Sequence, residues 1–136
     1  MASSSITPAT DSIRMLLRLE ALAVAAFAAV AYAHTGVSWW LFAGLWLAPD
    51  LSMLGYLKNS CTGARFYNAA HTYILPATLA ASAWLLHARL PLAIALIWIN
   101  HIGVDRLCGY GLKYADGFGV THLGRVGKTP AATPQQ

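Results

Sequence analysis

The sequence predicts an all-α protein, an antiparallel four-helix transmembrane bundle. Of its 136 residues, 57% are hydrophobic and only 10% are charged, whereas soluble domains carry about 25% charged residues. The apolar residues form long blocks, each close to the ~20 residues that cross a bilayer as a helix. Only helices satisfy their own backbone hydrogen bonds in lipid, and short connections make neighbouring helices antiparallel.

The blocks follow one another along a single membrane domain, residues 14–126. Residues 1–13 are rich in Ser, Thr, Ala and Pro and predict a disordered tail, as do residues 127–136 at the other end. The Gly-rich segment that follows the last block cannot continue a stable helix, and we expect it to pack back on the cytoplasmic mouth of the bundle. The predicted spans are about 15–33, 38–57, 67–86 and 90–112.

The basic residues predict the orientation. The chain has nine Lys and Arg residues, and all except Arg89 fall on the side of the two termini. The positive-inside rule therefore predicts a multi-pass protein of the cell membrane with both termini in the cytoplasm. A cleavable signal peptide is the alternative for the first block, because Arg14, Arg18 and Ala31-Tyr32-Ala33 fit one, but Glu20 within the block argues against it.

Charge also restricts the partners. The net charge is +4, but Lys and Arg stand singly at the ends of apolar blocks. Nucleic-acid binding needs a clustered basic patch, so no nucleic acid is expected. The expected partner is the lipid bilayer, and the sequence is also compatible with a homo-oligomer.

The strongest chemical motif is in the fourth block. His101 and Asp105 are four residues apart and share one helical face. A charged side chain near the bilayer centre costs at least ~2.5–3.5 kcal/mol unless it is paired, which makes such residues functional candidates. The pair can hold a metal ion, or the carboxylate can orient the imidazole. A metal site needs three or four ligands, so other helices would have to supply the rest.

The other apolar blocks also contribute ionisable residues at a similar depth in the membrane. At ~1.5 Å per residue, each lies about 9–18 Å from the nearest basic residue on the predicted cytoplasmic side. His122 in the Gly-rich tail could reach the same place if the tail folds back. This composition suits Zn, Mn or non-haem Fe. The predicted metal ligands are Asp50, His71, His101, Asp105 and His122.

Several of these residues have plainer interpretations. His71 can be a hydrogen-bonded residue of the bundle, His122 can be solvated, and Glu20 is expected to pair with Arg18 or Arg106. His34 and His87 are expected to meet interfacial water at the opposite face. The candidates for catalysis are Asp105 and Arg106, and the predicted polar network is Arg18, Glu20, Asn68 and Asn100.

The segments RLEAL, APDLSMLGY, YNAAHTYILP and WINHIGVDRLCGYGLKYADGFGVTHLGR closely resemble the family called domain of unknown function 4260 over about residues 14–126. The resemblance implies a small bacterial multi-pass membrane protein and no established activity. A looser likeness is to membrane-bound metal-dependent hydrolases, which also place His and Asp one turn apart in apolar helices.

Three functions are compatible with these residues. The first is a metal-dependent membrane hydrolase acting near the cytoplasmic leaflet, in which the metal activates water and Arg106 meets an anionic head group. The second is a structural or assembly protein whose polar cluster fixes helix packing. The third is a proton- or ion-coupled transporter subunit, since buried Asp and His residues form proton relays.

Overall fold

The computed structural model describes residues 11–126. The first helix begins three residues inside the segment predicted as an N-terminal tail, and the predicted tails otherwise lie outside the described residues. The elements are α1 (Asp11–Thr35), α2 (Trp39–Leu45), the 3-10 helix η1 (Ala48–Leu57), α3 (Ser60–Ala70), α4 (Ile74–Leu85), α5 (Arg89–Cys108), β1 (Val120–Thr121) and β2 (Gly124–Arg125).

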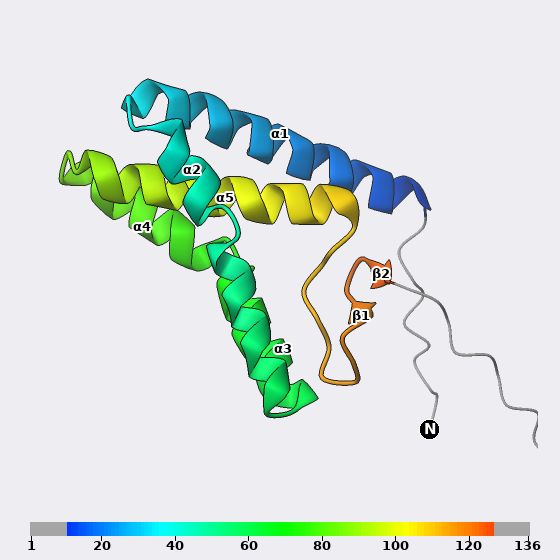
Figure 1. Ribbon diagram of the computed structural model, residues 1–136. Coiled ribbons are helices and arrows are strands. Elements are labelled where there is room, and N and C mark those ends of the chain that lie inside the picture. The colour runs from blue at the N-terminus through cyan, green and yellow to red at the C-terminus, as the bar shows by residue number, and fades with distance from the viewer. Residues whose placement is uncertain (1–10, 127–136) are drawn as a thin grey trace, which may run out of the picture.

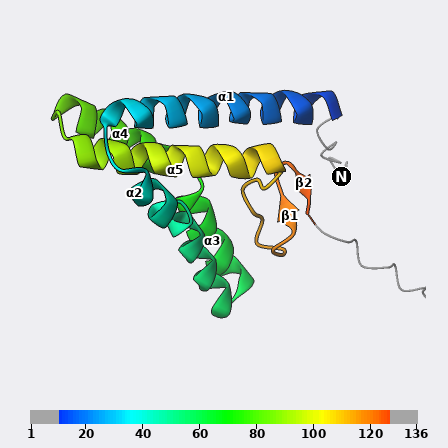
Figure 2. The ribbon, with the colours of Figure 1, turned by 45° about the horizontal axis from the view of Figure 1, so that its top comes forward.

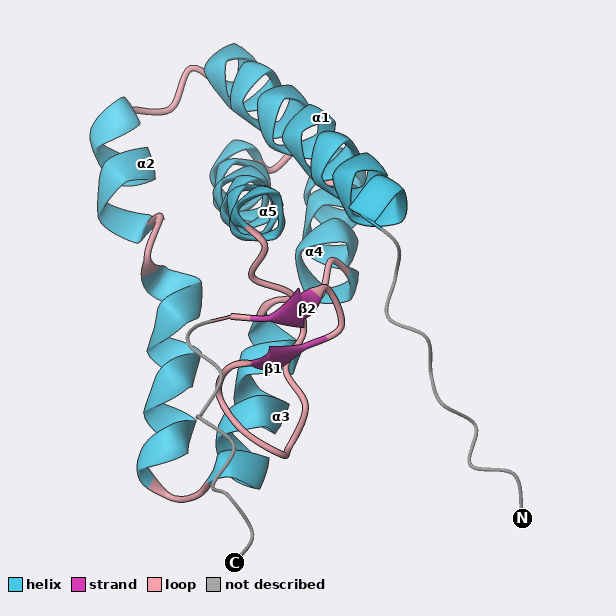
Figure 3. Cartoon of the chain, turned by 90° about the vertical axis from the view of Figure 1, so that its right-hand side faces the viewer, coloured by secondary structure: helices cyan, strands magenta, loops and turns pink. Residues whose placement is uncertain are grey.

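Helix α5 is the centre of the fold. It is seen nearly end-on in Figure 3, with α2, α1 and α4 on different sides of it. Helix α1 lies along α5 for most of its length (Figure 1). Small residues permit this approach: a Cβ atom on Gly103 would lie 3.0 Å from the Ala21 carbonyl oxygen and from the Ala25 side chain. Such small-residue contacts are typical of helices that pack closely in membranes.

A hydrophobic core fills the end of the bundle where α5 begins. Tyr32 of α1 is completely buried there with Leu96 and Ile97 of α5. Its ring packs against Trp39 and Phe42 of α2, with centroids 4.9 and 5.0 Å away. Its hydroxyl donates to the Ser38 carbonyl at 2.7 Å. The short α2 is therefore fixed to the long helices by aromatic packing.

The second and third predicted spans are not continuous helices. The block 38–57 is divided into α2 and η1, and the block 67–86 is divided between α3 and α4 by a turn at residues 71–73. Proline explains both breaks, because it lacks an N–H and suits the first turn of a new helix. Pro49 stands at the start of η1, and Pro76 stands in the first turn of α4.

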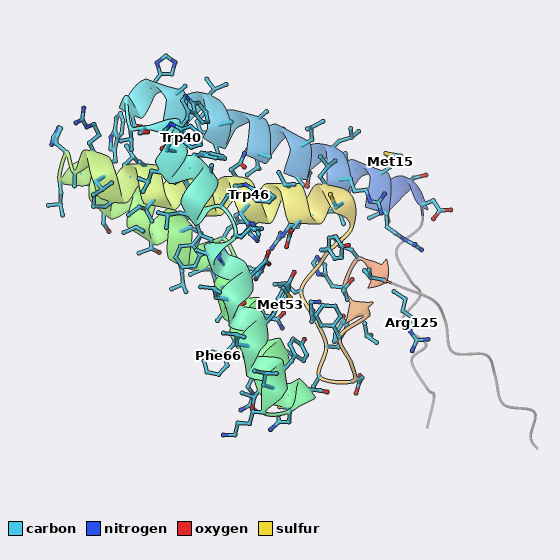
Figure 4. All side chains as sticks on the ribbon, in the orientation of Figure 1. Met15, Trp40, Trp46, Met53, Phe66 and Arg125 are labelled. Carbon is cyan, nitrogen blue, oxygen red and sulfur yellow. The ribbon has the colours of Figure 1, made fainter. Side chains whose placement is uncertain are left out.

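Beyond these breaks, η1 and α3 form a pair that leaves the bundle at a steep angle to α5 (Figure 1 and Figure 2). The two helices pack closely, since a Cβ atom on Gly63 of α3 would overlap the Tyr56 ring of η1. Phe66 of α3 points away from the pair (Figure 4) and is 60% exposed. The pair is therefore not part of a parallel-sided four-helix bundle.

The Gly-rich C-terminal segment folds back on the helices, but it is not helical. Strands β1 and β2 form an antiparallel hairpin, and Lys113 bridges to Thr121 (Figure 3). Helix α5 ends because Gly109 adopts a left-handed conformation with φ of 94°, which glycine accepts without steric cost. The prediction that this segment does not continue the helix is confirmed, and the two short strands leave the fold mostly helical.

Helices α1 and α5 are long and apolar enough to cross a membrane. Buried core helices and signal sequences can have the same length and composition. Large apolar side chains do cover the outside of α1, including Leu16, Phe27 and Val30, which are 57%, 73% and 60% exposed. The chain is thus a possible membrane protein.

Candidate metal centre

Four of the predicted ligands come together beside α5. His101 and Asp105 lie one turn apart on that helix, Asp50 lies in the first turn of η1, and His71 is the residue that ends α3. Both helix breaks therefore occur beside the cluster, and each delivers one ligand to it. Asp50, His71, His101 and Asp105 each offer one ligand atom, and these atoms all lie within 4.8 Å of one another.

Five of the six separations among the four ligand atoms are close to those of a tetrahedral site. The Nε2 atoms of His71 and His101 are 3.2 Å apart. The Asp50 Oδ1 atom lies 3.3 and 3.4 Å from them, and the Asp105 Oδ2 atom lies 3.4 and 3.7 Å from them. An ion with bonds of about 2.0–2.1 Å in a tetrahedral site needs ligand atoms about 3.3–3.4 Å apart. The group could therefore hold a metal ion.

Burial divides the ligands into two kinds. The imidazoles of His71 and His101 are 4% and 1% exposed, whereas the carboxylates of Asp50 and Asp105 are 28% and 19% exposed. Water or a small molecule can therefore approach the cluster from the carboxylate side. The imidazole side is closed by protein.

The backbone of α3 sets the tautomer of His71. Its Nδ1 atom lies 2.9 Å from the Tyr67 carbonyl oxygen, which can only accept a hydrogen bond. Nδ1 therefore carries the proton, and Nε2 presents a lone pair to the centre of the cluster. A backbone carbonyl on the outer nitrogen is the usual support of a metal-binding histidine. The rings of Tyr67 and His71 also stack, with centroids 3.8 Å apart.

Tyr67 supports a second ligand, since its hydroxyl donates to Asp105 Oδ2 at 3.2 Å. The buried ammonium group of Lys113 lies 4.5 Å from the centroid of the same ring and 3.1 Å from that of Phe118. Burial lowers the pKa of Lys113, and attraction to Asp105 and Asp50 opposes that shift. Lys113 thus adds positive charge beside the two carboxylates.

His101 is held from the α2 side. The Trp46 ring meets its imidazole edge-on with centroids 5.0 Å apart (Figure 4). Trp46 Nε1 donates to Asn100 Oδ1 at 2.9 Å, and Asn100 Nδ2 donates to the Ala25 carbonyl at 2.8 Å. Asn100 therefore ties α1, α2 and α5 together. Within residues 11–126, the buried His101 Nδ1 atom has no hydrogen-bond partner.

His122, the fifth predicted ligand, is not brought into this group. Its Nδ1 atom accepts from the Leu112 N–H at 2.8 Å, which closes the C-terminal segment on itself. Burial and the nearby Arg106 lower the pKa of His122, and its bond to Leu112 opposes that shift. The sequence predicted that this residue lies near the cytoplasmic mouth of the bundle, but it did not show in which direction the loop points its side chain.

The remaining predicted polar residues occupy other places. Arg106 lies over the Tyr73 ring, 4.5 Å from its centroid, and donates to the His71 carbonyl at 3.4 Å. Arg106 also lines a cavity of about 120 Å³ together with Glu20 and His122. The structure describes no ion pair between Glu20 and Arg18 or Arg106 in residues 11–126, contrary to expectation.

Arg18 and Asn68 both meet the chain that follows α5. The Arg18 guanidinium lies beside Gly109, where a Cβ atom would be only 2.7 Å from it. This places its charge at the C-terminus of α5, which favours cations. Asn68 accepts from the Lys113 N–H at 2.7 Å and donates to the Lys113 carbonyl at 2.8 Å. Asn68 therefore locks the C-terminal segment onto α3.

An apolar pocket of about 290 Å³ adjoins the centre. Pro49 and Ala70, which line it, are the chain neighbours of the ligands Asp50 and His71. Ser52 lines it as well, and its buried hydroxyl has no partner in the described part of the chain. The pocket could receive the apolar part of a ligand next to the metal ligands.

Sequence reasoning missed Lys113, Trp46 and Ser52 as parts of this region. In the sequence, Lys113 is a basic residue just beyond the fourth predicted span, and Trp46 is an apolar residue within the second predicted span. Only Lys113 had a possible signal, because a lone Lys among glycines and aromatic residues fits a folded segment better than a solvated one.

Comparisons with known proteins give one match. The model of the family described as Domain of unknown function (DUF4260) matches residues 14–126. No curated protein and no solved structure matches the chain. The family match includes all four residues of the cluster and most of the chain, so the protein belongs to the family described as Domain of unknown function (DUF4260).

Proposed function

We propose that this protein binds a divalent metal ion, Zn²⁺ in the first place, and uses it to hydrolyse a substrate with an apolar part at a membrane. The observation that carries the proposal is the cluster of Asp50, His71, His101 and Asp105, in which five of the six separations between ligand atoms are 3.2–3.7 Å, close to those of a tetrahedral site. Two imidazoles and two carboxylates suit Zn, Mn or Fe.

Charge supports a cation at this position. With neutral imidazoles, Asp50 and Asp105 give the cluster two negative charges whose ligand atoms lie within 4.8 Å of each other. Like charges so close destabilise each other unless a positive charge lies between them. Lys113 supplies one charge from behind the Tyr67 ring. A divalent ion would neutralise both carboxylates directly.

Two features favour hydrolysis among the reactions of such an ion. A bound divalent metal lowers the pKa of a coordinated water to about 7 and so supplies a nucleophile at neutral pH. The partly exposed carboxylates leave one side of the cluster open. The pocket beside Pro49, Ser52 and Ala70 would hold the apolar part of the substrate.

In the proposed reaction, one water is added across an ester-type bond. The water oxygen bonds to the electrophilic atom, and the bond to the leaving group breaks. An Asp50 carboxylate oxygen would accept the proton of the water and pass it to the leaving group. No oxidant or reductant is needed.

We place α1 and α5 across the membrane. At ~1.5 Å per residue, the 12 residues of α4 reach only about 18 Å, which is too short for ~30 Å of hydrocarbon. In this arrangement α2 and α4 enter from the side of Arg89 and end at the level of the cluster. The η1–α3 pair then leaves the bundle on the cytoplasmic side, where Lys58 and Arg65 agree with the positive-inside rule.

The test is metal analysis of the full-length protein, purified in a neutral detergent without chelators. We expect about one metal ion per chain, lost in His101→Ala and in Asp105→Asn. His34→Ala is the matched control, because it removes a histidine far from the cluster. Less than about a tenth of an ion per chain after reloading with Zn²⁺, Mn²⁺ or Fe²⁺ would overturn the proposal.

A closed structural metal site is the second candidate, and a specific observation favours it. Four protein ligands already complete a tetrahedron, as in structural zinc sites, whereas catalytic sites usually keep one position open. Esters with acyl chains of different lengths distinguish the two functions. Metal-dependent hydrolysis that is lost in Asp50→Asn supports the enzyme. A metal-loaded protein that hydrolyses none of them supports the structural site.

A further inference from the structure

A second site lies at the other end of the molecule, in a groove between α1 and α4. The groove has a volume of about 830 Å³, within the ~300–1,000 Å³ of small-molecule sites. Its floor is α5, on which both walls pack. Leu92, Leu96 and Ile99 form the floor, and Ala31, Ala77 and Ala80 line the walls. Small wall residues leave the floor accessible to a slender apolar ligand.

One end of the groove carries the basic groups. His34 at the end of α1, His87 in the turn after α4 and Arg89 at the start of α5 all line it. No ion pair involves Arg89 in the described residues. From Arg89 to Ile99, the floor extends about 15 Å along the helix. The groove is therefore apolar along its length and cationic at one end.

No acidic side chain of the described residues lies at that end. The five acidic residues are Asp11, Glu20, Asp50, Asp105 and Asp116. Asp105 lies about 24 Å from Arg89 along α5, and Glu20 lies about 21 Å from His34 along α1. Asp11 is farther still along α1, Asp116 follows the opposite end of α5, and Asp50 is in the cluster with Asp105. Among the described residues Arg89 therefore has no acidic partner, and an anion from outside would supply one.

The backbone of His87 is consistent with a role for its side chain. Its φ is 53°, a left-handed conformation that glycine adopts most easily. The His87 N–H donates to the Trp84 carbonyl and the Ala88 N–H to the Ala83 carbonyl, which is the helix-ending motif that normally contains glycine. The chain keeps an imidazole there, at the cationic end of the groove.

We propose that this groove binds one anionic phospholipid, with an acyl chain along α5 and the phosphate at Arg89. An arginine guanidinium forms strong bidentate hydrogen bonds with phosphate. A soluble anion would leave the apolar floor uncovered. A zwitterionic lipid brings its own cation to the unpaired arginine. The head-group end of the groove is separate from the metal centre, because His101 lies about 18 Å from Arg89 along the same helix.

Lipid binding to the purified full-length protein tests this proposal. Native mass spectrometry in a neutral detergent would compare phosphatidylglycerol with phosphatidylcholine of identical acyl chains. We expect phosphatidylglycerol to bind about tenfold more tightly, as for charge-assisted hydrogen bonds at a partly dry site. Inorganic phosphate without a chain is expected not to compete at millimolar concentration.

Matched variants separate the head group from the chain. Arg89→Gln should remove the preference between the two lipids, and Ala80→Phe should weaken both lipids by filling the groove. Lys58→Gln, which removes an exposed cation at the other end, should behave as the wild type. His87→Gly removes the imidazole, and glycine suits the left-handed backbone at this position. A reduced preference for phosphatidylglycerol in this variant therefore cannot come from misfolding.

Three results would overturn the proposal: equal binding of the two lipids to the wild type, an unchanged preference in Arg89→Gln, or unchanged affinities in Ala80→Phe. None of these results depends on metal content, so the metal centre and the lipid site can fail separately.

Discussion

The Nε2 atoms of His71 and His101 lie 3.2 Å apart, although the two residues are 30 positions apart in the chain. One histidine ends α3, and the other lies within the continuous helix α5. Because His71 Nδ1 faces a carbonyl oxygen, the Nε2 lone pair of His71 is directed at its neighbour. Two imidazoles in this relation either share a proton or bind a common cation, and the adjacent carboxylates favour the cation.

Tyr67 is expected to strengthen the metal site without touching the metal. Tyr67→Phe keeps the ring stacked on His71 but removes the hydroxyl that donates to Asp105. Loss of such a supporting hydrogen bond typically lowers metal affinity by about 10–100-fold. Competition with a chromophoric chelator measures the affinity. Tyr73→Phe is the control, because the buried Tyr73 hydroxyl has no partner among the described residues; an equal effect of both changes would refute the role of Tyr67.

Gly103 is expected to control the packing of α1 on α5. Gly103→Leu would place a side chain where a Cβ atom is already 3.0 Å from Ala21 and Ala25. Overpacking of this kind costs about 1–3 kcal/mol, so the thermal midpoint of unfolding should fall. Gly44→Leu is the matched control, since a Cβ atom on Gly44 meets nothing within 4 Å. Equal midpoints for the two variants would contradict the close approach.

Asn68 is expected to hold the C-terminal segment closed. Asn68→Ala removes both hydrogen bonds to the Lys113 backbone and should raise the local opening of this segment. Lys113 is 5% exposed, so trypsin should cut after it faster in the variant than in the wild type. Cleavage after the exposed Lys58 is the internal control. If cleavage at both sites rises equally, the change unfolds the whole protein instead of releasing the segment.

His122 is expected to make stability depend on pH. Burial lowers its pKa in the folded state below the ordinary histidine value of 6.5, so the fold favours the neutral ring. The stabilisation is complete above the unfolded-state pKa and decreases as the pH falls through it, because the unfolded chain then binds the proton more readily. The thermal midpoint of the wild type should therefore fall between about pH 7 and pH 5.

His122→Asn supplies the comparison, because an Asn oxygen can still accept from the Leu112 N–H without titrating. As the pH is lowered, the thermal midpoint of the wild type should fall relative to that of the variant. Both proteins keep the four residues of the metal cluster, so metal release at low pH affects them alike. Parallel midpoint curves across this range would show that His122 does not contribute.

The metal cluster was partly predictable. His101 and Asp105 follow from helical spacing, and Asp50 and His71 follow from their depth in neighbouring apolar blocks. His122 was also predicted as a ligand, because its expected position near the cytoplasmic mouth does not show in which direction its side chain points. Lys113 and Trp46 were missed because their roles depend on which rings and amides surround them. The continuity of the second and third spans was also mispredicted, since Pro49 and Pro76 were treated as kinks within helices when each begins a new one.

The apolar blocks, their order and the scarcity of charge can be read from the sequence, because they depend on local hydrophobicity and chain length. The sequence also places three of the five acidic residues, Glu20, Asp50 and Asp105, within those blocks. The packing of the helices is what brings Asp50, His71, His101 and Asp105 to one centre and leaves Arg89 without an acidic side chain nearby among residues 11–126. Those facts depend on distances between segments far apart in the chain, which helix packing and the two breaks set.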